Sequence, residues 1–356
     1  TLFAREVLRI AGDGAGVAVS GGVAAGVVAA SEPMIVRRSP GGLVAVNKPA
    51  GTAVFPVAGR EKEEKGSREK RSARPGTGGP PLTKLMEDWA AGQSLGPLHV
   101  ISPLKPDPSG LVLLALKGSA FAAAAAREPA AEPQRRFVAL VTGRLPPGEG
   151  RGRYGALLRC SEPLRQLGGS TGGVGADPSP PPDAADGADT RAARRRPPKL
   201  PAVTDFETLF SLGDDVVPGG ASLVVATPHT RVAEQVRRHL LHLGCPACGD
   251  KTFGDFKANR RFAGVLGLPR IFLHCFEAEL PESWAVGAAS GGDGGADGDA
   301  YSVLRCPLPA VLKAFLERLL ARAAGDPPLA AEAAAWIGLG EASPSGEAEG
   351  EADGHR

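Results

Sequence analysis

The chain has 356 residues, of which 42% are hydrophobic, so it holds enough apolar material for a globular body of one or two domains. Its formal net charge is only +2, so any affinity for nucleic acid must come from local basic patches rather than from a global field. Five irregularly spaced cysteines argue against a secreted disulfide framework, and no apolar run reaches the roughly 18 residues of a membrane span. We therefore expect an intracellular protein of unspecified compartment, without a membrane partner.

The first part of the chain gives weak signals followed by clear ones. Residues 1–33 are expected to form a weakly structured segment in front of a domain over residues 34–323. Apolar patterning predicts strands over 34–38 and 43–46, and a Pro/Gly turn ends the second strand. Residues 57–81 carry mixed charges and predict a disordered insert; a basic arm beside a nucleic-acid site is the alternative. Pro81–Trp89 has helical periodicity, with Thr83 as a candidate N-cap.

The remainder predicts a mixed α/β core interrupted by polar inserts. Strands are expected over 111–116, 136–142, 202–210, 222–227 and 271–280, and helices over 119–127, 232–243 and 309–323. Low-complexity inserts are expected at about 161–200 and 287–300, and residues 324–356 form an acidic, disordered tail. Strands do not alternate strictly with helices, so a doubly wound parallel sheet is not favoured.

Four segments carry motifs, in this order: Leu43-Val-Ala-Val-Asn-Lys-Pro-Ala-Gly51; Ser102-Pro-Leu-Lys-Pro-Asp-Pro-Ser-Gly110 with its apolar run; Arg135-Arg-Phe-Val-Ala-Leu-Val-Thr-Gly143; and Gln235-Val-Arg-Arg-His-Leu240 with Leu243-Gly-Cys-Pro-Ala-Cys-Gly-Asp250. They resemble motifs of the RluA-type RNA pseudouridine synthases. The corresponding family patterns are Asn-Lys-Pro-x-Gly; His-Arg-Leu-Asp-x-x-Thr-Ser-Gly; Lys-x-Tyr-x-Ala-Leu-Val-x-Gly; and Gln-Ile-Arg-x-His-Leu with Leu-Gly-x-Pro-x-x-Gly-Asp. The fourth segment is the most specific, because its two motifs occur at the family spacing.

This resemblance implies an α/β (α+β) pseudouridine-synthase fold. The expected architecture is a curved, mixed and mostly antiparallel sheet with flanking helices and disordered inserts, and an RNA cleft crosses its middle. The chemistry breaks the glycosidic bond of uridine, turns the base and rejoins it through carbon, so the nucleotide must be flipped out of its stack. The family uses one aspartate as nucleophile or base, an arginine that pairs with it, and a tyrosine against the base.

The aligned positions depart from that pattern. Lys105 stands where the resemblance places the catalytic aspartate, and Phe137 takes the tyrosine position without its hydroxyl. Arg237 keeps the position of the paired arginine. Two neighbouring cations disfavour each other, so we expect an RNA phosphate between Lys105 and Arg237. The leading hypothesis is therefore an RNA-binding member of the family with impaired or lost isomerisation.

Two alternatives stay open. Asp107 could be brought into the catalytic place if the prolines of the loop reroute its backbone, which would give an active synthase on ribosomal or transfer RNA. The third reading is a protein-interaction scaffold in a ribosome-related assembly, with ribosome-assembly factors as partners. The protein is expected to be a monomer. Candidate RNA contacts are basic residues in or beside the motifs: Lys48, Arg135, Arg136, Arg231 and Arg238.

No cofactor and no metal are expected. Cys245 and Cys248 have metal-like spacing, but they fall within a turn where the family carries no metal, and a pair of buried thiols is favoured over a zinc site. His239 and His274 are expected to be structural, and Asp250 is expected to cap the following turn.

Overall fold

The computed structural model describes residues 34–39, 41–56, 79–128, 131–153, 155–165, 198–284 and 303–323. The segment 1–33, most of the three inserts and the tail 324–356 lie outside the described residues. Among the helices of the described ranges, none is long and apolar enough to cross a membrane.

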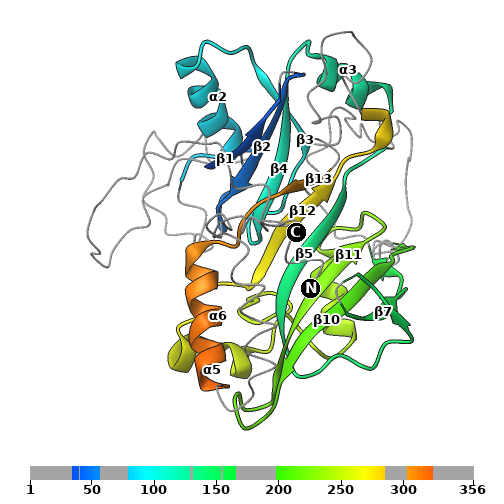
Figure 1. Cartoon of the computed structure of the whole chain (residues 1–356), viewed down its shortest axis with the longest axis vertical. Helices are drawn as coiled ribbons and strands as arrows, with labels where there is room; N and C mark the ends of the chain where they lie inside the picture. The colour runs from blue at the N-terminus through cyan, green and yellow to red at the C-terminus, as the bar shows by residue number, and fades with distance from the viewer. Residues whose placement is uncertain are drawn as a thin grey trace, which may run out of the picture.

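One 11-stranded sheet dominates the described part of the chain (Figure 1). Its strands are β1 (Met34–Arg38), β2 (Leu43–Lys48), β3 (Leu98–Ser102), β4 (Ser109–Leu116), β5 (Gln134–Thr142), β6 (Gly150–Arg151), β7 (Ala156–Cys160), β10 (Thr204–Leu212), β11 (Ala221–Pro228), β12 (Leu273–Glu279) and β13 (Val303–Arg305). The spatial order is β1-β2-β4-β12-β5-β11-β10-β7-β6, with β3 beside β4 and β13 beside β12. The β4–β12 pair is parallel and the sheet is otherwise antiparallel in the described residues, which confirms the predicted class.

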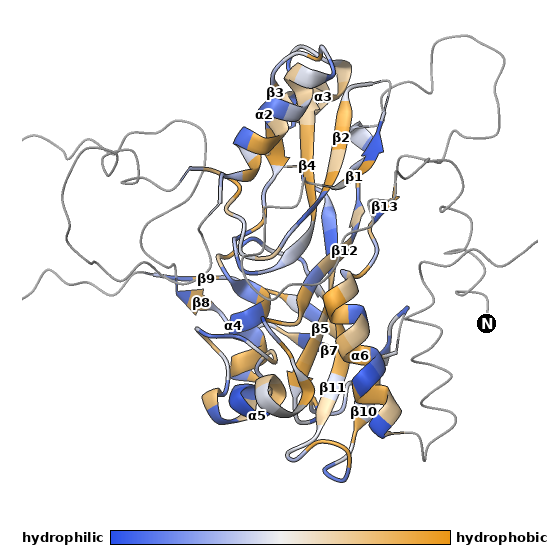
Figure 2. Ribbon diagram, turned by 90° about the vertical axis from the view of Figure 1, so that its left-hand side faces the viewer, coloured by the Kyte–Doolittle hydropathy of each residue, from blue (hydrophilic) through white to orange (hydrophobic). Residues whose placement is uncertain are grey.

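In the described ranges, five α-helices flank the sheet: α2 (Leu82–Gly92), α3 (Ala120–Arg127), α4 (Gln235–His242), α5 (Phe256–Leu266) and α6 (Ala310–Arg322). Alternate residues of the central strand β5 face opposite sides. Phe137 and Ala139 belong to an apolar cluster with α2, α3 and α4, whereas Val138 and Leu140 belong to a second cluster with α5 and α6. The core therefore lies on both faces of the sheet. Along the length of the molecule, α2 and α3 lie at one end and α4, α5 and α6 at the other (Figure 2).

The main predicted strands and helices are confirmed, and several details are corrected. The helix expected over 232–243 begins only at Gln235, because Glu234 has a left-handed backbone with φ of 58°. Thr83 is not an N-cap: α2 starts after Pro81, and the Thr83 N–H donates to the carbonyl of Val54.

Two features escaped the sequence patterns. Helix α5 was not predicted, although Asp255 caps it by accepting two backbone N–H bonds and a glycine ends it. The ends of the 161–200 insert pair as short strands β8 (Leu164–Arg165) and β9 (Lys199–Leu200).

A glycine brings the two halves of the sheet together. Gly110 has φ of +120°, and a Cβ at this position would lie 2.2 Å from the carbonyl oxygen of Cys275. The close approach lets β12 pair with the first residues of β4, where His274 is opposite Ser109 and Cys275 is opposite Gly110. The loop that precedes β4 is thereby held against the centre of the sheet.

Candidate functional site

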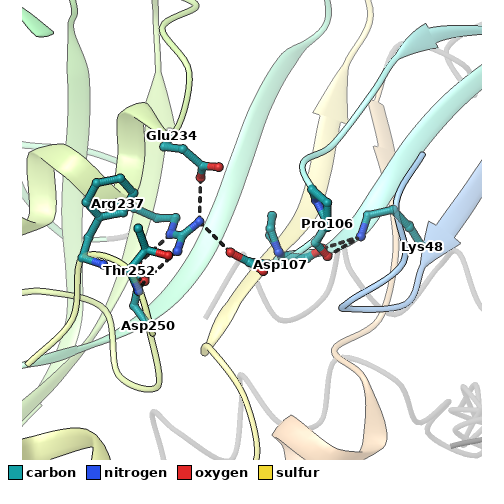
Figure 3. A network of polar contacts seen from close by, with 9 residues as sticks. Lys48, Pro106, Asp107, Glu234, Arg237, Asp250 and Thr252 are labelled. Atoms are coloured by element: carbon teal, nitrogen blue, oxygen red, sulfur yellow. Dashed lines mark hydrogen bonds and ion pairs between the residues drawn. The ribbon is translucent and has the colours of Figure 1, made fainter. Parts of the chain in front are cut away.

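A buried lysine, Lys48, binds the loop between β3 and β4 (residues 103–108) and holds it in place. The Lys48 ammonium at the end of β2 donates to the carbonyls of Pro106 at 3.0 Å and Pro108 at 2.7 Å. It also donates to the carbonyls of Pro49 at 2.9 Å and Thr52 at 3.1 Å, so the turn and the loop share one donor. Figure 3 shows Lys48 and the Pro106 carbonyl facing one another.

The Lys48 side chain is fully buried. Burial, and to a smaller extent the positive charge of Arg270, lower its pKa to about 7, and the negative charge of Asp107 acts in the opposite direction. Since the ammonium points into the protein, the prediction that Lys48 contacts RNA is corrected. Its contacts make it a clamp for the 103–108 loop.

Arg237, in the first turn of α4, is the centre of a carboxylate cluster. Its Nε and Nη2 donate to the two oxygens of Asp250, both at 2.6 Å. Its Nη1 donates to Glu234 at 2.7 Å and to Asp107 at 2.9 Å. The guanidinium also lies over the ring of Phe253, 5.0 Å from the ring centroid. We call Arg237, Asp250, Glu234 and Asp107 the arginine–carboxylate cluster.

The electrostatics of this cluster favour its charged form. Burial alone would lower the pKa of Arg237, but the bond to Asp250 and the charges of Glu234, Asp250 and Asp107 outweigh it and raise the pKa. Burial likewise opposes ionisation of Asp250, yet the bonds from Arg237 and from the N–H groups of Phe253 and Thr252 hold the pKa of that carboxyl below its usual range. Asp250 therefore caps its turn, as predicted, and also anchors the arginine.

The cluster runs from the protein interior to the surface. The Asp250 side chain is 0% exposed, that of Glu234 is 18% exposed and that of Asp107 is 53% exposed. In Figure 3 the Asp107 carboxylate points toward Arg237, while the neighbouring Pro106 carbonyl points the opposite way, toward Lys48. The loop thus presents one solvent-accessible carboxylate, that of Asp107, which is bound to the buried and oriented guanidinium of Arg237.

This geometry argues against the expected RNA phosphate between Lys105 and Arg237. The acid that reaches Arg237 is Asp107, two residues farther along the loop, and Lys105 is half-buried. The guanidinium already binds three carboxylates, so an RNA phosphate placed there would meet three negative groups. A phosphate bridge between Lys105 and Arg237 is therefore not favoured.

The other predicted site residues fall in different surroundings. Phe137 is buried on β5, in register with Ala226 of β11 and Cys275 of β12. Arg135, whose pKa is lowered by burial, donates to the carbonyl of Pro103 at 2.9 Å and to the Ser102 hydroxyl, so it holds the start of the loop. This role was not anticipated, and it adds a second clamp on the same loop.

The remaining predicted RNA contacts bond groups other than Asp107. Arg136 pairs with Glu277 and with Glu279, and its ion pairs lie across the β5–β12 ladder. Arg231 pairs with Glu132 and is exposed, whereas Arg238 is half-buried and bonds a carbonyl of its own segment.

The histidines and cysteines have structural surroundings. His239 contacts the Thr204 hydroxyl and a backbone carbonyl, and His274 contacts the Ser109 hydroxyl; both rings are fully buried. Burial raises the pKa of the Cys245 and Cys248 thiols. In the described ranges, no group of three or more metal-ligating side chains is placed to hold an ion.

Sequence reasoning missed Glu234 as a member of the site. Its three-residue spacing from Arg237 at the start of a helix could have indicated the pair, because residues at i and i+3 are neighbours on a helix.

Comparison with known proteins places this site in context. The chain is 34% identical over 85 residues to tRNA pseudouridine synthase C of Yersinia pestis, covering 22% of this chain and 33% of the relative. It is 28% identical over 280 residues to an uncharacterized RNA pseudouridine synthase of Chloroflexus aurantiacus, covering 78% of this chain and 66% of the relative. The alignments thus span between one third and two thirds of these relatives. No protein-family model matches the chain.

Two human proteins are among the solved structures to which the chain is similar. The human RNA pseudouridylate synthase domain containing 4 superposes with a TM-score of 0.48 at 19% identity, over 80% of this chain and 92% of that one. The human RNA pseudouridylate synthase domain containing 1 gives a TM-score of 0.47 at 18% identity, over 82% and 96%. The curated relatives of this chain are RNA pseudouridine synthases.

Proposed function

We propose that this protein is an RNA pseudouridine synthase in which Asp107 is the essential carboxylate. The observation that carries the proposal is the 2.9 Å contact between Asp107 and Nη1 of Arg237, a cation that Asp250 fixes from the other side. The sequence alone ranked this reading behind a loss of activity, because Lys105 holds the aspartate position of the motif.

The arrangement suits the chemistry. Conversion of uridine to pseudouridine needs a carboxylate that acts as nucleophile or base at the sugar or base of a flipped nucleotide. The Asp107 side chain is half-exposed, so a nucleotide can reach it, and Arg237 orients it. Lys48 and Arg135 hold the loop at both ends, and such fixed positioning is worth several powers of ten in rate. Phe137 is proposed to stack on the flipped base.

RNA is the proposed partner. One relative's name specifies tRNA, so transfer RNA is the first substrate to test and ribosomal RNA the second. The exposed Arg231 and the half-buried Arg238, beside and within α4, are proposed to meet the RNA backbone. The protein is proposed to act as a monomer, and ribosome-assembly factors remain candidate partners.

A second candidate is RNA binding without isomerisation. It is favoured by Lys105 at the motif position and by the sharing of one Arg237 nitrogen between two carboxylates.

The test compares pseudouridine formation in transfer and ribosomal RNA by the parent chain, Asp107→Asn and the control Asp88→Asn. Asp88 is exposed on α2 and pairs with its helix neighbour Lys84, so its substitution removes the same charge away from the site. We expect Asp107→Asn to lose at least about 100-fold in rate and Asp88→Asn to lose none. An inactive parent that binds RNA and gains activity in Lys105→Asp would establish the second candidate instead.

A further inference from the structure

Glu234 has an unusual backbone conformation, and helix capping by its side chain does not account for it. It is one of two non-glycine residues with positive φ in the described ranges, at 58°, a conformation that costs about 1 kcal/mol. It occupies the N-cap of α4, yet its side chain caps no N–H group of that helix. The carboxylate instead turns to Nη1 of Arg237 at 2.7 Å. The backbone conformation therefore accompanies the placement of an acid in the site, not the capping of the helix.

Glu234 and Asp107 share one nitrogen atom. Asp107 accepts from the same Nη1 at 2.9 Å, so the two carboxylate oxygens lie no farther apart than the sum of the two bonds. Asp250 cannot join them, because it is fully buried and its oxygens already accept from Arg237 and from two backbone N–H groups. Of the three carboxylates on Arg237, only Asp107 and Glu234 are reachable from solvent.

The proposed reaction has two tasks for carboxylates. The bond from C1′ to N1 of uracil breaks and a bond from C1′ to C5 forms. C5 then carries both the sugar and its original hydrogen. The C5 proton must leave, its electron pair restores the ring double bond, and N1 takes up a proton, so the product is an isomer. One group acts when the glycosidic bond breaks, and a base must then stand beside C5.

We propose that Glu234 is a second catalytic residue, the base that accepts the C5 proton, an inference that rests on the proposed function of Asp107. When the proton leaves, C5 is bonded to C1′, so the base must lie within a few ångströms of the group that acts at C1′. Glu234 meets that condition through the shared nitrogen. Arg237 holds both acids, and Asp250 keeps the arginine in place whichever acid is engaged.

The experiment separates proton removal from glycosidic chemistry. Glu234→Gln keeps the size and an oxygen acceptor for Arg237 but is not a useful base. It is compared with the parent chain, with Asp107→Asn and with Glu87→Gln, an exposed glutamate on α2. Three RNA substrates are used, carrying uridine, 5-deuterouridine or 5-fluorouridine at the target position. The fluorinated base has no C5 proton to lose.

We expect Glu234→Gln to slow pseudouridine formation by about 100-fold or more, with a primary deuterium isotope effect larger than that of the parent. It should still consume 5-fluorouridine at the rate of the parent. Asp107→Asn should lose both reactions, and Glu87→Gln neither. Glu234→Gly suits the positive φ and lacks the acid, so it should fold stably and behave like Glu234→Gln.

The outcomes are distinguishable. A parent chain that converts neither uridine nor 5-fluorouridine refutes the proposed function, and the inference falls with it. If the parent is active and Glu234→Gln keeps its rate on uridine, the inference alone is wrong. Equal loss on all three substrates by Glu234→Gln also overturns it, since that result assigns Glu234 to holding Arg237 and not to proton transfer.

Discussion

Replacing Lys48 by methionine tests whether the carbonyl clamp holds the 103–108 loop. The ammonium serves four backbone carbonyls with three protons, and the shortest bond, to Pro108, is 2.7 Å. Methionine fills a similar volume but donates no hydrogen bond. At least three carbonyls therefore lose their donor, at about 1–3 kcal/mol for each one left buried.

An opposing effect reduces that loss. The charged ammonium is costly to bury, by several kcal/mol, and the substitution removes this cost. We therefore expect Lys48→Met to lower the free energy of unfolding by about 2–4 kcal/mol at pH 6, where the lysine is charged. The loop should also become more accessible, because Pro106 and Pro108 are freed from β2.

Urea denaturation at pH 6 measures the first effect, and the rate of limited proteolysis between residues 103 and 108 measures the second. Lys84→Met is the matched control, because Lys84 is exposed on α2 and its substitution should stay within about 0.5 kcal/mol. An unchanged urea midpoint together with unchanged protection of the loop would refute the clamp.

Three further predictions follow from the same contacts. Lys48 has a pKa of about 7 in the folded protein, whereas the unfolded lysine keeps its proton until about pH 10. The unfolded state therefore binds more protons between pH 7 and pH 10, and the free energy of unfolding should rise across this window by up to about 1.4 kcal/mol per pH unit. Urea titrations should show that Lys48→Met lacks this rise. Asp250→Asn weakens a buried ion pair and should lower the free energy of unfolding, measured with urea, by about 3 kcal/mol, whereas Asp88→Asn should leave it unchanged. Equal urea midpoints for the two variants would contradict the anchoring role of Asp250. Gly110→Ala drives a Cβ to 2.2 Å from the Cys275 carbonyl at a positive φ and should cost more than about 3 kcal/mol in thermal unfolding, whereas Gly92→Ala, with nothing within 4 Å, should be neutral or stabilising.

The strand framework was predictable because its signals are local. Residues 111–116 and 137–141 are continuous apolar runs, and such runs indicate strands buried on both faces. Helix α5 was not predicted, although its buried residues Ala258, Phe262 and Leu266 fall at helical spacing and its capping aspartate and terminal glycine were visible in the sequence.

The site was less predictable because its contacts are long-range. Aligning the motif places Lys105 at the catalytic position only if the loop backbone follows the family path. In the structure the Lys48 clamp binds the carbonyls of Pro106 and Pro108, and Asp107 between them reaches an arginine 130 residues away. Nothing in the sequence near Lys48 indicates that the carbonyls it binds include two from 58 and 60 residues downstream.

The place of β12 has a consequence for how the protein folds. This strand enters the sheet between β4 and β5, although more than a hundred residues of chain separate it from both. During synthesis, β1 to β4 can pair early, but they lack their neighbour until residues 273–279 emerge. Such non-local pairing slows folding and leaves strand edges exposed in the interim. The loop bearing Asp107 and the helix bearing Arg237 therefore meet only late, when the last central strand closes the sheet.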